Sequence, residues 1–132
     1  MTGIRPFSRF IRKYWISMAL CILILVLCFI NTGSLPEVPM TNFDKLVHAL
    51  MFLALSGAVF FDNTCYLRRA IGGQRIFWGS LLLPVGVGGC IEIVQTFLPY
   101  RSGDWKDFLF DCVGAILGCL IGWLINRRLK PA

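Results

Sequence analysis

Four long apolar runs, separated by short polar segments, form the main pattern of the sequence. They cover approximately residues 14–30, 44–61, 76–98 and 107–125. A helix needs roughly 20 mainly apolar residues to cross the hydrocarbon core of a bilayer, with about 17 as the lower limit. Because backbone groups in lipid must find hydrogen-bond partners within the chain, each run is predicted to be a transmembrane helix.

The composition supports a membrane protein. Of the 132 residues, 57% are hydrophobic and 15% are charged, and a soluble domain of this length lacks an interior large enough for so much apolar surface. The length also leaves room for one bundle and for no separate soluble domain. We therefore predict a single all-α domain over residues 1–132, a four-helix transmembrane bundle.

Lysine and arginine are distributed unevenly between the two sides of this bundle. One side has only Lys45, Arg101 and Lys106, and the remaining ten of the 13 basic residues belong to the other side. Cytoplasmic segments are enriched in lysine and arginine. Both termini are therefore predicted to be cytoplasmic, and the segments 31–45 and 99–107 to face outward. Charges gathered at span ends argue against binding to nucleic acid, which requires a basic face on a folded domain.

Ionisable residues within the apolar runs gather at the outward end of three helices. A charged group costs roughly 2.5–3.5 kcal/mol at a helix centre on insertion scales, so each of these residues needs an explanation. Their spacing of three or four places the members of each helix on one face. The sequence therefore predicts one outward-facing pocket with these polar side chains: Asp44, Lys45 and His48; Glu92 and Gln95; Arg101, Asp104, Asp107 and Asp111.

Most of these residues also have a structural explanation, which the sequence leaves open. Capping or charge at a helix N-terminus would account for Asp44 and Asp107, and a hydrogen bond between helices would account for Gln95. Glu92 and Asp111 are harder to explain in this way, because both lie within apolar sequence. The prediction of a functional pocket therefore depends mainly on these two carboxylates.

A glycine stripe follows Asp111 along the fourth helix. Gly114, Gly118 and Gly122 lie four residues apart and share a face with Asp107 and Asp111. Small residues at this spacing let helices pack closely in lipid. The stripe is therefore predicted to be a packing surface, either within the bundle or between copies in a homo-oligomer.

The polar residues also form a recognisable set of motifs. The chain contains Asp44-Lys45-x-x-His48, Glu92-x-x-Gln95, Arg101-x-x-Asp104-x-x-Asp107 and Gly114-x-x-x-Gly118. Over about residues 40–125 it resembles the VanZ-like family of bacterial membrane proteins. The resemblance implies a four-helix, multi-pass fold in the bacterial cytoplasmic membrane, and the founding member is associated with low-level teicoplanin resistance. The sequence departs from the family at Asp111, where asparagine is expected, and so adds a carboxylate to the pocket.

The residues support two main interpretations of the pocket. In the first, it binds the head group of a membrane lipid, a lipid-linked envelope molecule or a lipoglycopeptide. Lys45 and Arg101 would hold a phosphate or carboxylate, and His48 and the acids would hold hydroxyl or amine groups. The tail of the ligand would remain in the bilayer beside the pocket.

The alternative is an intramembrane enzyme that transfers or hydrolyses a lipid head group. Its catalytic candidates are Glu92, His48 and Asp104. Glu92 or His48 would act as general acid or base, with His48 held in one tautomer by Asp44, and Arg101 would stabilise developing negative charge. No serine or cysteine nucleophile is evident, so a carboxylate or an activated water would be required.

A metal site and a purely structural role are also open. One histidine with carboxylates such as Glu92 can hold a divalent ion, but no ligand spacing in the sequence requires it. The six cysteines form no Cys-x-x-Cys pair, which argues against a zinc or redox site. The sequence therefore predicts neither a metal nor another cofactor.

Overall fold

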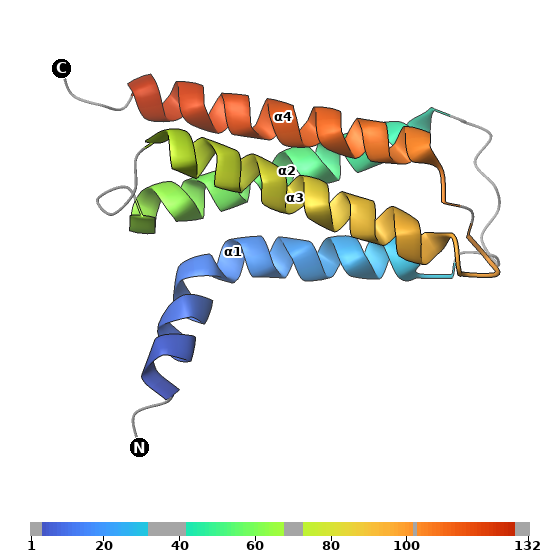
Figure 1. The fold of residues 1–132 in the computed structure, drawn as a ribbon, viewed down its shortest axis with the longest axis horizontal. Coiled ribbons are helices and arrows are strands. Elements are labelled where there is room, and N and C mark those ends of the chain that lie inside the picture. The colour runs from blue at the N-terminus through green and yellow to red at the C-terminus, as the bar shows by residue number, and fades with distance from the viewer. Residues whose placement is uncertain (1–3, 32–41, 68–72, 102, 129–132) are drawn as a thin grey trace.

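The computed structural model describes residues 4–31, 42–67, 73–101 and 103–128, which form four helices and no strand (Figure 1). The helices are α1 (Ile4–Phe29), α2 (Phe43–Leu67), α3 (Gly73–Gln95) and α4 (Trp105–Arg128). Each is long and apolar enough to cross a membrane, which confirms the predicted all-α architecture with four candidate spans. The chain is therefore a multi-pass membrane protein.

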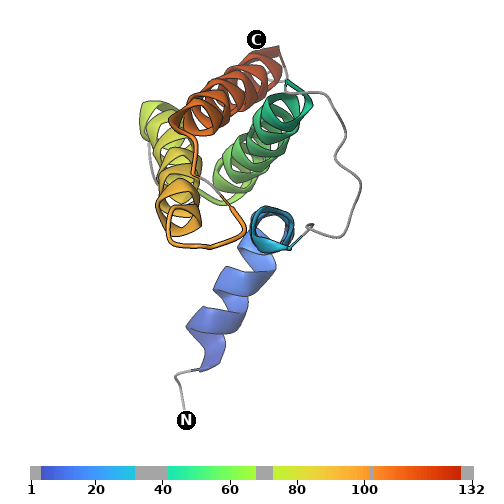
Figure 2. The same cartoon turned by 90° about the vertical axis from the view of Figure 1, so that its right-hand side faces the viewer.

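The four helices alternate in direction along the chain (Figure 1). α2 and α4 make the most extensive contact, and α1 packs mainly against α2. Figure 2 shows α1 on the side of α2 and α3 that faces away from α4. The core between α1, α2 and α3 consists of buried apolar side chains: Ile24, Cys28, Phe52, Leu55, Val59 and Ile91.

The two ends of the bundle differ in charge. The end at which α2 and α4 begin is called the acidic end here, because it has five of the seven acidic residues: Asp44, Glu92, Asp104, Asp107 and Asp111. The opposite, basic end has Arg75 near the start of α3 and Arg127 and Arg128 in the last turn of α4. Which end faces the cytoplasm stays a prediction from the distribution of basic residues.

The glycine stripe of α4 is the contact surface for α2. A Cβ atom on Gly114 would collide with the carbonyl oxygen of Ala49, and one on Gly118 would collide with that of Leu53. Gly122 lies against the ring of an α2 phenylalanine. The predicted role in close packing is confirmed, and the partner is a helix of the same chain. α2 covers Gly114 and Gly118, which are buried. A homo-oligomer formed through the stripe stays a prediction.

α1 is broken at Tyr14, whose backbone leaves the helical region (φ −111°, ψ 21°). The part before this residue bends away from the bundle (Figure 1). The break leaves N–H groups of the next turn without helical partners, and the buried carboxylate of Asp62 accepts hydrogen bonds from the Ser17 N–H at 3.3 Å and its hydroxyl at 2.6 Å. The second apolar run ends at residue 61, whereas α2 continues to Leu67. Asp62 therefore lies within the bundle and caps the second part of α1.

Candidate functional site

The acidic end contains a buried contact between α2 and α4. Nδ1 of His48 lies 2.9 Å from Oδ1 of Asp111, and both side chains are buried. The glycine stripe explains this proximity, because Gly114 lets α4 approach the backbone of Ala49, the residue after His48. The sequence predicts Asp44 as the residue that orients His48, whereas in the structure Asp111 makes this hydrogen bond. The close contact between two helices decides the partner, which spacing within α2 alone does not.

Glu92, near the end of α3, is held against the start of α4. One carboxylate oxygen, Oε2, accepts a hydrogen bond from the backbone N–H of Asp104 at 3.1 Å. Gly103 allows this approach, because a Cβ atom there would collide with the Thr96 side chain and the Glu92 carbonyl oxygen. The other carboxylate oxygen, Oε1, is buried and has no hydrogen-bond partner among the residues that the structure describes.

Five residues from α2, α3 and α4 form what we call the acidic cluster: Asp44, His48, Glu92, Asp107 and Asp111. Oxygen and nitrogen atoms of His48, Glu92 and Asp111 lie within 4.8 Å of one another. The same limit holds for Asp44, His48 and Asp107, so His48 links the two groups. Asp44 is exposed and Asp107 is half-buried, whereas the other three residues are buried. The cluster therefore leads from the surface into the bundle.

The cluster combines four carboxylates with one imidazole. Carboxylates accept hydrogen bonds from hydroxyl and ammonium groups, and an imidazole accepts or donates a proton near neutral pH. Lys45 is half-buried and interacts electrostatically with Asp107. The excess of carboxylates favours a ligand that donates hydrogen bonds or carries positive charge.

Gln95 and Arg101, both predicted to line the pocket, lie at the end of α1 and outside the acidic cluster. Gln95 Nε2 donates to the carbonyl oxygen of Cys28 at 2.9 Å, and the Arg101 guanidinium donates to that of Leu27 at 3.4 Å. The Tyr100 hydroxyl donates to a third carbonyl group of the same turn. The last carbonyl groups of a helix have no partners within it, so these side chains cap α1. The structural alternative for Gln95, a hydrogen bond between helices, is confirmed.

Asp104 caps the N-terminus of α4. Its backbone carbonyl oxygen accepts a hydrogen bond from the N–H of Asp107 at 2.9 Å, and its side-chain Oδ1 accepts one from the N–H of Lys106 at 3.0 Å. An aspartate in this position supplies an acceptor for N–H groups that lack helical partners. Within the described part of the chain it forms no ion pair with Arg101.

A groove with a volume of about 640 Å³ lies between the end of α3 and the start of α4. Glu92 and Asp104 form its charged wall, and the rest of its lining is largely apolar. Phe97 is 81% exposed and Trp105 is 68% exposed, so the apolar wall reaches the outer surface of the bundle. The groove thus connects the surface that would face lipid with the carboxylate of Glu92.

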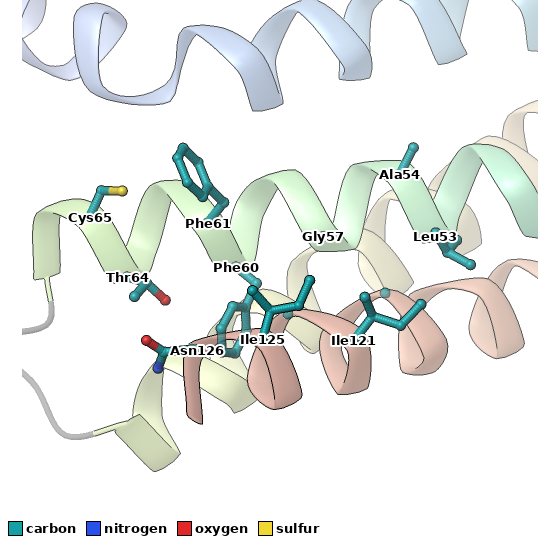
Figure 3. A pocket seen from close by; sticks show the side chains of 12 residues that line it. Leu53, Ala54, Gly57, Phe60, Phe61, Thr64, Cys65, Ile121, Ile125 and Asn126 are labelled. Atoms are coloured by element: carbon teal, nitrogen blue, oxygen red, sulfur yellow. The ribbon is translucent and has the colours of Figure 1, made fainter. Parts of the chain in front are cut away.

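A second groove lies between α2 and α4 toward the basic end (Figure 3). Its volume is about 430 Å³, and its walls are mainly apolar, with Phe60, Phe61, Ile121 and Ile125 among them. The described residues that line it include no carboxylate, imidazole or basic group. This groove therefore offers no charged recognition or acid–base chemistry and is not the candidate site.

Two glycines shape the site although neither belongs to a polar motif. Gly103 brings Asp104 to Glu92, and a Cβ atom on Gly88 would lie 3.0 Å from Oδ2 of Asp111. Gly88 therefore provides room for that carboxylate on the α3 side. In the sequence, the only local signal for either role is the position of Gly103 directly before an aspartate at a helix start.

Comparison with known proteins gives one family and one distant relative. A sequence model of the VanZ/LLP1 family matches residues 5–126. The chain is 31% identical over 115 residues to an uncharacterized protein of the fission yeast Schizosaccharomyces pombe, a match that covers 82% of this chain and 64% of the yeast protein. The chain thus spans less than two thirds of the length of that relative. No solved structure matches the chain significantly.

Proposed function

The chain belongs to the VanZ/LLP1 family, and on that premise we propose that it binds the polar head group of a lipid-linked molecule or lipoglycopeptide at its acidic end. The observation that carries this proposal is the groove between α3 and α4, with Glu92 and Asp104 on one wall and exposed aromatic side chains on another. An amphipathic ligand matches this combination, because its tail would stay in lipid while its head group reaches the carboxylates.

The charges in the groove select the type of head group. Glu92 and Asp104 are hydrogen-bond acceptors when ionised, so they favour hydroxyl or amino groups of a sugar or peptide. The phosphate contact expected for Arg101 has less support, because its guanidinium donates to the carbonyl oxygen of Leu27. We therefore assign a head group rich in hydrogen-bond donors.

The cellular role follows from this ligand class. With the acidic end facing outward from a bacterial cytoplasmic membrane, the groove would meet lipid-linked envelope intermediates and lipoglycopeptides at the depth of lipid head groups. Sequestering or shielding such a molecule would contribute to teicoplanin-type resistance. In a susceptible host, expression of the chain should raise the inhibitory concentration of teicoplanin, and Glu92→Gln should abolish that rise.

Direct binding tests the proposal more sharply. The purified chain in lipid nanodiscs would be titrated with a fluorescent glycolipid that has an amino-sugar head group and with a matched phosphocholine lipid. Glu92→Gln should weaken glycolipid binding at least about tenfold, since a hydrogen bond to a charged group contributes about 1.5–3 kcal/mol. Asp62→Asn, a change at a buried acid near the basic end, is the matched control. Equal binding of both lipids, or no effect of Glu92→Gln, would contradict the proposal.

The hydrogen bond between His48 and Asp111 favours a second candidate, an intramembrane enzyme. A base oriented by a carboxylate is a recurring catalytic arrangement, and Glu92 lies within 4.8 Å of the pair. Such an enzyme would release or transfer the head group of the same lipids. Mass spectrometry of the glycolipid after incubation separates the two functions: intact glycolipid supports binding alone, and His48-dependent loss of the head group supports catalysis.

A further inference from the structure

Two carboxylate oxygens of the acidic cluster are buried without a described hydrogen-bond partner. They are Oε1 of Glu92 and Oδ2 of Asp111. Glu92 is 7% exposed and Asp111 is fully buried. A buried polar atom left unsatisfied is costly, and the cost is larger when the group is charged. These two atoms therefore indicate a partner other than the protein groups that the structure describes.

The charges around these oxygens also require compensation. Among the residues that the structure describes, His48 lies within 4.8 Å of both Glu92 and Asp111, and its imidazole can carry positive charge. Arg101, which could have neutralised them, is directed to a carbonyl oxygen of α1. Buried charges in proteins are paired or coordinate metal ions. A cation would satisfy both the unpaired oxygens and the excess negative charge.

The geometry points to a divalent metal ion held by His48, Glu92 and Asp111. Ligand atoms bonded to one ion at about 2.0–2.2 Å lie at most about 4.4 Å apart. The ligand atoms of this group already lie within 4.8 Å of one another, so small side-chain movements would close them around an ion. The three residues come from three different helices, which explains why no ligand spacing is visible in the sequence.

The ligand types limit which metal fits. One imidazole with two carboxylates suits Mn²⁺, Fe²⁺ or Zn²⁺, whereas Ca²⁺ and Mg²⁺ prefer sites made of oxygen alone. Asp44 and Asp107 lie on the surface side of His48 and share it as a neighbour. They provide a path of carboxylates along which a cation reaches the buried group. The metal site requires no head-group ligand and is therefore independent of the proposed function.

The test is direct metal binding by the full chain. The protein would be purified in nanodiscs of zwitterionic lipid, stripped with EDTA and titrated separately with Mn²⁺ and Zn²⁺. We expect saturable binding of one ion per chain. Loss of a residue that merely orients a ligand weakens metal binding by about 10–100-fold, so loss of a ligand in Glu92→Gln, Asp111→Asn or His48→Gln should weaken it at least as much. Asp62→Asn should bind as the unaltered chain does.

A spectroscopic measurement on the unaltered chain does not depend on folded variants. Pulsed electron paramagnetic resonance of bound Mn²⁺ should show coupling to a histidine nitrogen. Absence of saturable binding, absence of nitrogen coupling, or unaltered affinity in all three ligand variants would overturn the metal site, as expected if the carboxylates share a proton instead. Metal binding without glycolipid binding would support the metal site and contradict only the proposed function.

Discussion

Nδ1 of His48 lies 2.9 Å from Oδ1 of Asp111, which joins α2 to α4 inside the acidic end of the bundle. Both side chains are almost completely buried. When a buried pair of this kind loses one member, the other is left without compensation. The contact therefore stabilises the bundle at the same place where it forms the candidate site.

Replacement of Asp111 should separate these effects. Asp111→Ala is expected to lower the free energy of unfolding by about 1–3 kcal/mol, because it leaves a ring nitrogen of His48 buried without a hydrogen-bond partner. Asp111→Asn retains a side-chain oxygen that accepts a hydrogen bond from Nδ1, so this variant should lose only about 1 kcal/mol of unfolding free energy. Reversible unfolding in detergent micelles measures both. Equal losses for the two variants would contradict a stabilising hydrogen bond.

The close approach of α4 to α2 depends on Gly114. Gly114→Ala places a methyl group against the carbonyl oxygen of Ala49 and should destabilise the chain by at least about 1–3 kcal/mol through overpacking. Gly86→Ala on α3 is the matched control, because a Cβ atom there meets no neighbour within 4 Å. The control should be neutral or slightly stabilising, since alanine is favoured in a helix interior. Similar thermal stability of the two variants would contradict the packing role of the stripe.

Gly103 controls the position of Glu92 without contributing a side chain. Gly103→Ala should push the backbone away from Thr96 and weaken the hydrogen bond between Asp104 and Glu92. Glu92 would then be displaced from the position in which it accepts a hydrogen bond from the head group. If the proposed function is correct, loss of that hydrogen bond to a charged group should lower glycolipid affinity about tenfold. Gly73→Ala, where a Cβ atom meets nothing within 4 Å, should leave the affinity unaltered. The nanodisc titration described above measures both variants.

The cap that Asp62 provides for α1 should contribute to stability alone. Asp62→Ala removes the acceptor of two hydrogen bonds from Ser17 and should cost about 1–3 kcal/mol of unfolding free energy. Ser17→Ala removes only the hydroxyl contact and should cost less. Denaturant titration of both variants tests this order, and a larger loss for Ser17→Ala would show that the backbone cap contributes little.

The predicted orientation can be tested with reporters of membrane topology. A fluorescent protein fused to the C-terminus, which follows α4 at the basic end, should fold and fluoresce, because that end is predicted to be cytoplasmic. Alkaline phosphatase inserted between α3 and α4 should be active, since it requires an outward location. The opposite result for both reporters would invert the topology and place the acidic cluster on the cytoplasmic side.

The site could be predicted from the sequence only in part. Glu92, His48 and Asp111 were identifiable because ionisable groups are rare within apolar runs and costly in lipid. The pairing of His48 with Asp111 was not identifiable, because spacing along α2 points to Asp44. Gln95 and Arg101 belong to the same motifs as Glu92 and Asp104, yet their side chains cap α1. No local sequence pattern indicates that α1 ends beside α3.

Sequence by itself determined four apolar helices and the end of the bundle at which the carboxylates gather, because helix length, hydropathy and position along the chain are local properties. Only the tertiary structure decided which polar side chains meet. That choice depends on how closely two helices approach, and here Gly114 and Gly103 set the approach by leaving space for backbone atoms of a neighbouring segment. The absence of a side chain at a glycine matters only where another segment packs against that glycine. The partners of His48 and Glu92 can therefore be identified only in the folded bundle.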